Sequence, residues 1–256
     1  MGEQTVLTGE GFLNIRGDFR IGGVVNVGTQ CSLVETGPGS FVFLDSYTLP
    51  APVRAEVDRI VGNSKVTAIL NLHPFHTIHC EWMHGAFPNA KLYGTSRHLH
   101  HLPQLPWQDT LCESQEFAQA FASALEFSVP DGVDLVSNND KVHFSSVLAF
   151  HPASGTIHAD DTLSRLHLPG PLGLLPLSDR LDFHPTLAKA LKPQAGAADA
   201  FRNWAISLGE KWQDARYIAT AHNSGMEMKR GSLPVLIAEA LERVRSTLDA
   251  HRKQYG

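Results

Sequence analysis

The sequence predicts an α/β fold in which β-sheets are sandwiched between helices, and in which residues 1–256 form a single domain. Three observations lead to this prediction. Strand-like runs open the chain, strand and helix patterns alternate through its middle, and a helix–strand–helix order closes it. No change in composition along the chain marks a linker between two domains.

The first third of the chain begins with a predicted hairpin. Residues 24–35 and 41–45 are rich in β-branched and aromatic residues, and the turn sequence TGPGS lies between them. Residues 51–62 carry apolar side chains at helical spacing and end in glycine, which predicts an amphipathic helix. Residues 65–72 are an almost continuous apolar run, as expected for a strand that is buried on both faces.

The middle of the chain alternates further strands and helices. The predicted elements are helices over 77–86 and 114–126 and strands over 90–94, 133–136, 141–150 and 155–159. Residues 163–196 are dense in proline, leucine and glycine without periodicity, which indicates a covering loop. The closing elements are a helix over 197–214, a buried strand over 217–221 and a terminal helix over 233–254.

The composition is that of an ordinary globular protein, with 43% hydrophobic and 18% charged residues. A formal net charge of -5 without a basic block argues against nucleic acid as a partner, and no apolar run is long enough to span a membrane. The absence of a signal-like start and three widely spaced cysteines favour a cytoplasmic protein with reduced thiols. We expect a small-molecule substrate or ligand; the oligomeric state stays open.

Histidine is unusually concentrated in the stretch NLHPFHTIHCEWMHGAFPNA, residues 71–90. His73, His76 and His79 follow one another at intervals of three residues, and imidazole is the commonest metal ligand. The same histidines would also suit a partly exposed corner between a strand and a helix, because Pro74 separates His73 from any helix that carries His79.

Further possible ligands occur at predicted strand ends, where α/β sheets build their sites. His143 lies in a predicted strand, Asp160 and Asp161 follow GTIHA, and His222 follows YIATA. Because Asp160 and Asp161 are adjacent, only one of them is expected to face the site.

The order of these motifs, over roughly residues 24 to 222, resembles the metallo-β-lactamase superfamily. CSLVETGPGSFVFLDS is similar to the opening hairpin of that family, which ends in an aspartate, here Asp45. VTAILNLHPFHTIH lies where the family has a strand leading into a His-x-His-x-Asp-His loop. SGTIHADDTL and IATAHNSG resemble the strands that carry the metal-bridging aspartate and the last histidine ligand, here Asp161 and His222. His143 best matches the middle histidine, and the resemblance implies an αββα sandwich of two mixed β-sheets flanked by helices.

The loop motif departs from the family pattern. His73 matches its first histidine, but Phe75, Thr77 and Ile78 occupy the positions of the second histidine, the aspartate and the final histidine. His76 and His79 therefore lie one residue out of register. The resemblance thus implies a degenerate site in which each of the two usual metals has lost ligands.

The ligands that remain are His73, His143, Asp161 and His222, which together would hold one Zn²⁺ or Fe²⁺ ion rather than two. His76 and His79 are expected to replace lost ligands or to carry protons in catalysis. The leading hypothesis is a metal-dependent hydrolase of an ester, lactone or thioester. The alternatives are a metal-free, non-catalytic binding protein that keeps the fold and pocket, and a redox iron protein, for which the sequence offers no flavin domain.

Four other positions carry lesser predictions. Asp45 is expected to orient a neighbouring loop or a ligand histidine rather than to bind metal, and His158 is expected to be exposed. The run HLHH at 98–101 is expected on the surface. Cys80 is expected to be a buried, inert thiol rather than a ligand or nucleophile.

Overall fold

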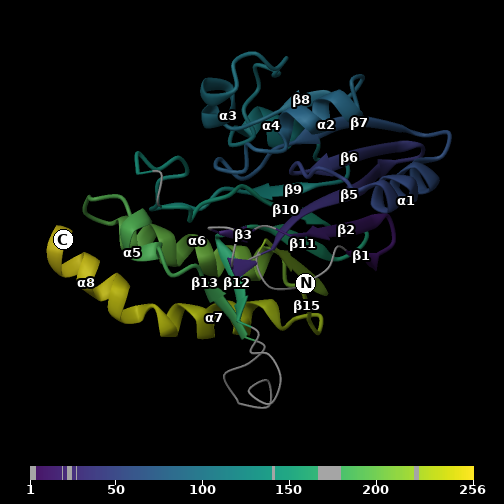
Figure 1. The fold of residues 1–256 in the computed structure, drawn as a ribbon. Helices are drawn as coiled ribbons and strands as arrows, with labels where there is room; N and C mark the ends of the chain where they lie inside the picture. The colour runs from purple at the N-terminus through teal and green to yellow at the C-terminus, as the bar shows by residue number, and fades with distance from the viewer. Residues whose placement is uncertain are drawn as a thin grey trace.

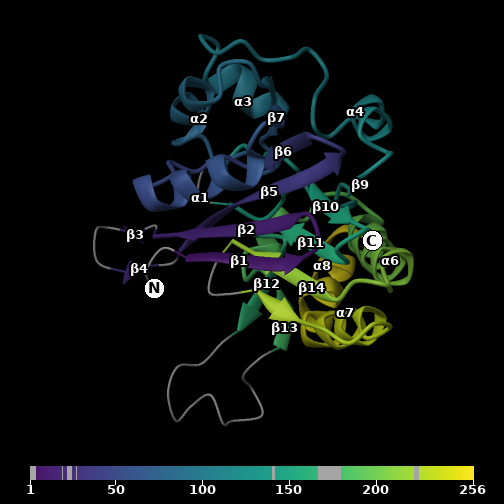
Figure 2. The same ribbon diagram turned by 90° about the vertical axis from the view of Figure 1, so that its right-hand side faces the viewer.

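The computed structural model describes residues 4–18, 20–21, 25–26, 28–139, 142–166, 180–221 and 225–256. Two β-sheets lie face to face in the middle of the molecule, and helices cover their outer faces (Figures 1 and 2). The predicted αββα sandwich of two mixed sheets is therefore confirmed. Among the described residues, no helix is both long and apolar enough to cross a membrane.

The first sheet has six strands in the order β1-β2-β5-β6-β7-β8. The strands are β1 (Gln4–Gly9), β2 (Phe12–Gly17), β5 (Thr29–Gly37), β6 (Ser40–Leu44), β7 (Lys65–Leu70) and β8 (Lys91–Tyr93). β5 and β6 form the predicted hairpin, while β7 lies parallel to both β6 and β8. β1 and β2, which complete one edge of this sheet, were not predicted from the sequence. A separate short ribbon pairs β3 (Arg20–Ile21) with β4 (Val25–Asn26).

The second sheet has five strands in the order β15-β14-β11-β10-β9. The strands are β9 (Glu126–Ser128), β10 (Leu148–His151), β11 (Thr156–Ala159), β14 (Tyr217–Thr220) and β15 (Met226–Glu227). Only the β11–β14 pair is parallel among the described strand pairs of this sheet. The parallel pair brings the ends of β11 and β14 to the same edge, where Asp160 and Asp161 follow β11.

Helices pack against the outer face of each sheet (Figure 1). The helices are α1 (Ala51–Val61), α2 (Cys80–Ala86), α3 (Ser96–His101) and α4 (Gln115–Ala120) in the first half, and α5 (Leu187–Ala190), α6 (Ala197–Lys211), α7 (Leu233–Arg243) and α8 (Arg245–Tyr255) in the second. Val57 of α1 and Met83 of α2 pack on outward-facing residues of the first sheet such as Phe43. Phe201 and Leu208 of α6 belong to the corresponding core outside the second sheet.

The space between the two sheets has an apolar end and a polar end. Because side chains alternate along a strand, Phe12 and Val34 share the inner face of the first sheet with Asn14, Arg16 and other residues two positions apart. At the apolar end, Phe12 and Val34 form one core with residues of the second sheet. At the polar end, the buried inner residues are Asn14, Arg16, Gln30 and Ser32. This polar end holds the candidate functional site.

Several predicted elements differ from the observed ones. The terminal helix is interrupted at Val244, and the predicted covering loop over 163–196 contains β12 (Leu163–Leu166), β13 (Arg180–Phe183) and α5, with 167–179 outside the described residues. Residues 133–136 form no strand, because Val133 makes only an isolated bridge to Leu191. The strand predicted over 141–150 begins at Leu148, and the helix predicted over 114–126 ends at Ala120.

Candidate functional site

Asp45 lies directly after β6 and fixes the segment that follows β7. Its backbone has a φ of 59°, a left-handed conformation that aspartate tolerates better than most residues. Its Oδ1 accepts hydrogen bonds from the amides of Leu72 (2.8 Å) and His73 (3.1 Å). Asp45 thus orients the chain around His73, as the sequence analysis predicted.

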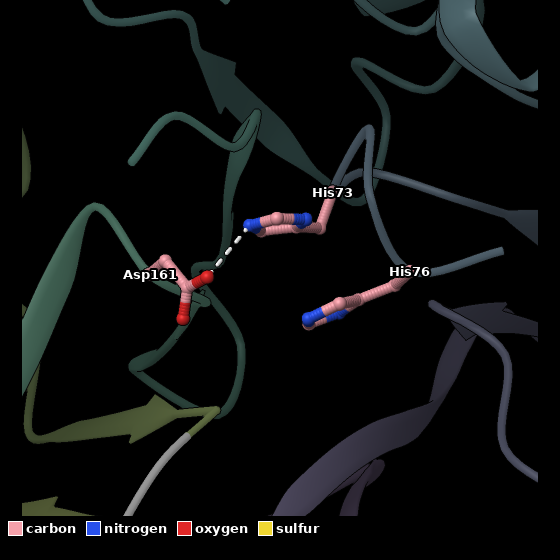
Figure 3. Close-up of side chains that lie close together, drawn as sticks. All are labelled: His73, His76 and Asp161. Carbon is pink, nitrogen blue, oxygen red and sulfur yellow. Dashed lines mark ion pairs between the residues drawn. The ribbon is translucent and has the colours of Figure 1, made fainter. Parts of the chain in front are cut away.

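His73 is fully buried and faces the aspartate that the family resemblance singled out. Its Nε2 lies 3.0 Å from Oδ2 of Asp161, which is itself 3% exposed (Figure 3). Its Nδ1 accepts a hydrogen bond from the amide of Phe75 (3.1 Å), so the neutral ring carries its proton on Nε2. Burial lowers the pKa of His73, but the nearby Asp161 carboxylate raises it more, and the net direction is upward.

His76 lies parallel to His73 on the same side of Asp161. The two ring centroids are 4.0 Å apart with an interplanar angle of 18°. Figure 3 shows nitrogen atoms of both rings turned toward Asp161. One ligand atom from each of His73, His76 and Asp161 lies within 4.8 Å of the other two, which is close enough for one metal ion to bind all three.

His76 also belongs to a second group, with Asp45 and Asp160. Its Nδ1 lies 3.7 Å from Oδ2 of Asp160, and Oδ1 of Asp160 accepts a hydrogen bond from Nε2 of Gln30 (3.0 Å). Burial and then the negative charge of Asp45 raise the pKa of Asp160 to about 6. The prediction that only one of Asp160 and Asp161 faces the site was wrong. Both line it, because the chain has left β11 before it reaches them.

His158 is buried, so the prediction that it is exposed was wrong. Its Nε2 lies 2.9 Å from Oδ2 of Asp45, and its Nδ1 lies 3.0 Å from Oγ of Ser32. Burial lowers the pKa of His158, but the bond with Asp45 and the charge of Asp160 raise it more. The period-two alternation of β11 could have placed His158 between the sheets, because its neighbours Ile157 and Ala159 belong to the outer core.

The other predicted ligands lie at different distances from these groups. The ring of His143 is stacked on Phe75, with centroids 4.4 Å apart, and lies 6.4 Å from the ring of His73; among the described residues, His143 belongs to neither ligand group. His79 is in neither group of described residues: its Nδ1 is 2.9 Å from Oγ1 of Thr48, beside Tyr47. His222 lies outside the described residues.

Two lesser predictions can be compared with the structure. In the run 98–101, His100 and His101 are exposed as predicted, but His98 is buried, and its ring packs near Trp107 with centroids 5.4 Å apart. Cys80 is buried as predicted, and burial raises the pKa of its thiol to about 12, which keeps it protonated and unreactive.

The residues present fit a metal ion of the zinc or iron type. The groups combine imidazole nitrogens with carboxylate oxygens, the ligands that such ions take in proteins. Among the described residues, Nε2 of His73 and Oδ2 of Asp160 are buried and make no aligned hydrogen bond. Buried polar atoms without a hydrogen bond are rare, and a cation bound at the ligand group to which an atom belongs would satisfy that atom.

Comparison with known proteins shows the fold. No protein-family model and no curated protein matches the sequence. A metallo-β-lactamase from Erythrobacter litoralis is 16% identical with a TM-score of 0.60, covering 93% of this chain and 96% of its own. FIM-1 from Pseudomonas aeruginosa, a metallo-β-lactamase in its mono-zinc form, is 12% identical with a TM-score of 0.59, covering 95% and 96%. One from Pontibacter korlensis is 12% identical with a TM-score of 0.57, covering 97% and 99%. The chain therefore has the metallo-β-lactamase fold over nearly its full length.

Proposed function

We propose that this protein is a metal-dependent hydrolase with a single metal ion, Zn²⁺ or Fe²⁺, at the polar end of the space between its sheets. The proposed ligands are His73 and Asp161, together with His143 and His222 as the sequence analysis predicted. The observation that carries the proposal is the buried His73–Asp161 pair, with a nitrogen-to-oxygen distance of 3.0 Å and no aligned hydrogen bond from His73 Nε2 among the described residues. The mono-zinc form of the similar FIM-1 supports one ion as a workable number for this fold.

The chemistry of a bound divalent ion is to lower the pKa of a water molecule and to polarise a carbonyl oxygen. The protein supplies the rigid frame around it. Asp45 holds the backbone of His73 in place, and the bond from His158 to Asp45 ties that frame to the second sheet. His76 stacks on His73 and is half-buried, so its ring can exchange a proton with a reacting group from within the site.

The substrate class that we propose is an ester, lactone or thioester, a small molecule with one activated carbonyl. A carbonyl of this kind needs only one activated water and one proton carrier for hydrolysis. We propose in addition that the protein works in the cytoplasm and without nucleic acid or membrane as a partner. Assays with an aryl ester, a simple lactone and an acyl thioester would compare the three classes directly.

The test is metal content and its effect on stability. Protein prepared without added metal is expected to contain about one equivalent of zinc or iron by elemental analysis. A metal present at 100 times its Kd stabilises the fold by about 2.7 kcal/mol, so a chelator should lower the melting midpoint by several degrees. His73→Ala should abolish both effects, while His79→Gln, outside the cluster, should preserve them. Metal-free protein with unchanged melting in chelator would overturn the proposal.

One observation favours the second candidate function, a metal-free binding protein. The amide of Phe75 donates to Nδ1 of His73, and this leaves the proton of the neutral ring on the nitrogen that faces Asp161. A metal ion at Nε2 would have to displace that proton. In a metal-free binding protein the proton stays between Nε2 of His73 and the Asp161 carboxylate. A chelator then changes neither the melting midpoint nor the binding of the ligand.

A further inference from the structure

His98 is a fully buried histidine outside the proposed ligand set, and it contacts the loop that carries His76. His98 lies in α3, which follows β8, while this site loop (residues 71–79) follows β7. β7 and β8 are parallel neighbours with Leu70 opposite Tyr93, so the segments that leave them begin at the same edge of the first sheet. A side chain of α3 can therefore reach the site loop.

The neighbours of His98 hold its ring in one orientation. Its Nδ1 accepts a hydrogen bond from the amide of Thr95 (3.2 Å) and lies 3.0 Å from Oγ1 of Thr95. The side chain of Thr95 accepts the amide of His98 in return, so His98 takes the place that glutamate or glutamine usually has in a capping box. The ring packs near Trp107, and a Cβ on Gly94 would come within 2.7 Å of the Cβ of His98. The ring therefore has little room to turn.

The bond from Thr95 determines which ring nitrogen carries the proton. A nitrogen that accepts a backbone N–H is unprotonated, so the proton of the neutral ring lies on Nε2. Burial and then the charge of a protonated His73 lower the pKa of His98 to about 3, while a hydrogen bond with the backbone of His76 acts in the opposite direction.

The direction of that last effect identifies the acceptor. A hydrogen bond that raises the pKa of a histidine is one in which the ring donates, so the partner is the carbonyl oxygen of His76. The alignment of this contact is imperfect, but Nε2 of His98 is buried and has no aligned hydrogen bond to any other described residue. At neutral pH, His98 is therefore a neutral donor that faces the site loop.

The site loop is held at both ends by side chains from other segments. At its start the carboxylate of Asp45 accepts the amide of His73, and at its end Thr48 bonds to the ring of His79. Between these ends the chain turns at His76, whose amide donates to the carbonyl of His73 (3.0 Å). Neither end contact reaches the carbonyl of His76, so the position of this residue depends on donors nearer to it.

The carbonyl of His76 has two donors beside it. The thiol of Cys80 is 3.5 Å away and is a weak donor, whereas the N–H of His98 is a stronger one on a ring that is itself fixed. We propose that His98 is a positioning residue, which holds the backbone of His76 so that the His76 ring stays stacked on His73, with 4.0 Å between the centroids. The inference rests on the proposed function, in which His76 carries protons.

Two matched variants separate the two hydrogen bonds of the His98 ring. The side-chain amide of glutamine can replace Nε2, so His98→Gln keeps the donor toward His76 and loses the acceptor for Thr95. The side-chain carbonyl of asparagine can replace Nδ1, so His98→Asn keeps the acceptor and loses the donor. We expect His98→Asn to lower both the affinity for Zn²⁺ and kcat with an aryl ester by about tenfold, and His98→Gln to stay within about threefold of the wild type.

A double-mutant cycle tests whether His98 acts through His76. When His76→Gln is already present, His98→Asn should have little further effect on the affinity for Zn²⁺. A role in packing alone would lower this affinity equally in both backgrounds.

Nuclear magnetic resonance of the metal-free protein gives a measurement that depends on neither metal nor activity. In the wild type, the ring of His98 should be neutral with its proton on Nε2. The ring protons of His76 should show the ring-current shift that stacking on His73 produces. This shift should be lost in His98→Asn and kept in His98→Gln.

The outcomes separate this inference from the proposed function. Equal losses in the asparagine and glutamine variants, or additive effects in the cycle, would overturn the inference. A proton on Nδ1 of His98 in the wild type would overturn it whether or not either variant folds. If the wild type neither binds Zn²⁺ nor hydrolyses the ester, the proposed function fails. His98 then remains a positioning residue only if the His76 shift is lost in His98→Asn and kept in His98→Gln; any other pattern overturns the inference as well.

Discussion

Two histidine–aspartate pairs are buried at the polar end of the molecule, and they differ in how completely they are hydrogen-bonded. In the His158–Asp45 pair the nitrogen and oxygen are 2.9 Å apart, and the far nitrogen of the ring is bonded to Ser32. The other oxygen of Asp45 accepts two backbone amides. In the His73–Asp161 pair the distance is 3.0 Å, but the geometry is not that of a hydrogen bond.

The same two residue types therefore have different roles within one site. The His158–Asp45 pair links the end of β6 to β11 and so joins the two sheets. A pair that is satisfied by its own protein has no need of a ligand, and its role is structural. In the His73–Asp161 pair, by contrast, Nε2 of His73 makes no aligned hydrogen bond with the described residues, and it is the atom to which we propose that the metal binds.

The largest effect is expected from Asp45→Ala. This change leaves His158 and two backbone amides buried without their acceptor, and the loss of one partner of a buried pair typically costs about 3–5 kcal/mol. Denaturant unfolding of the metal-free protein would measure it. Asp58→Ala, which removes an exposed ion pair with Arg54, is the control and should cost under about 1 kcal/mol. A small loss in Asp45→Ala would contradict the structural role of the first pair.

A smaller and metal-dependent effect is expected from Asp161→Asn. The variant should unfold like the wild type when both are metal-free, because the pair makes no aligned hydrogen bond on the His73 side. It should lose the stabilisation by metal, about 2.7 kcal/mol at 100 times the Kd. Unfolding with and without zinc gives both quantities. A large loss in the metal-free state would make the second pair as structural as the first.

Ser32→Ala tests whether the two histidine–aspartate pairs are independent of each other. The hydroxyl of Ser32 is bonded to Nδ1 of His158 and accepts the side-chain amide of Asn14, so its removal leaves buried polar groups unsatisfied. We expect a loss of about 1–3 kcal/mol in unfolding free energy and no change in metal content. Denaturant unfolding together with elemental analysis checks both. Metal loss in this variant would show that the two pairs are not independent.

The sequence predicted the fold far better than it predicted the site. Hydrophobic periodicity and the order of elements were sufficient for two sheets between helices, because these patterns reflect which face of each element is buried. Strand β2, which lies between β1 and β5, was missed because Asn14 and Arg16 make its inner face polar, although both are buried against the second sheet. Alternating polar residues of this kind indicate a strand with one face in solvent. The sequence does not show that the second sheet covers that face.

The site depends on distances that no local pattern contains. His73, Asp161 and Asp45 were singled out from motif order, and the structure brings their side chains to one end of the sandwich. Asp160 and His158 were passed over because their orientation depends on where β11 ends and which face it turns inward. The choice between His76 and His79 depends on the path of the loop after Pro74, which turns only the first toward the aspartates.

The smallest effect is expected from His79→Gln, which separates this residue from His76 three positions earlier. His79 bonds to Thr48 near the surface of the site loop, and the loss of that bond should cost about 1 kcal/mol or less in unfolding free energy. Metal content should not change, because no atom of His79 belongs to either ligand group of the described residues. His76→Gln is the matched change and should weaken metal binding by about tenfold or more while the fold is kept, because a ligand atom of His76 lies within 4.8 Å of those of His73 and Asp161. If His79→Gln lost metal and His76→Gln did not, the loop would turn His79 rather than His76 toward the metal. The ligand set would then differ from the one proposed.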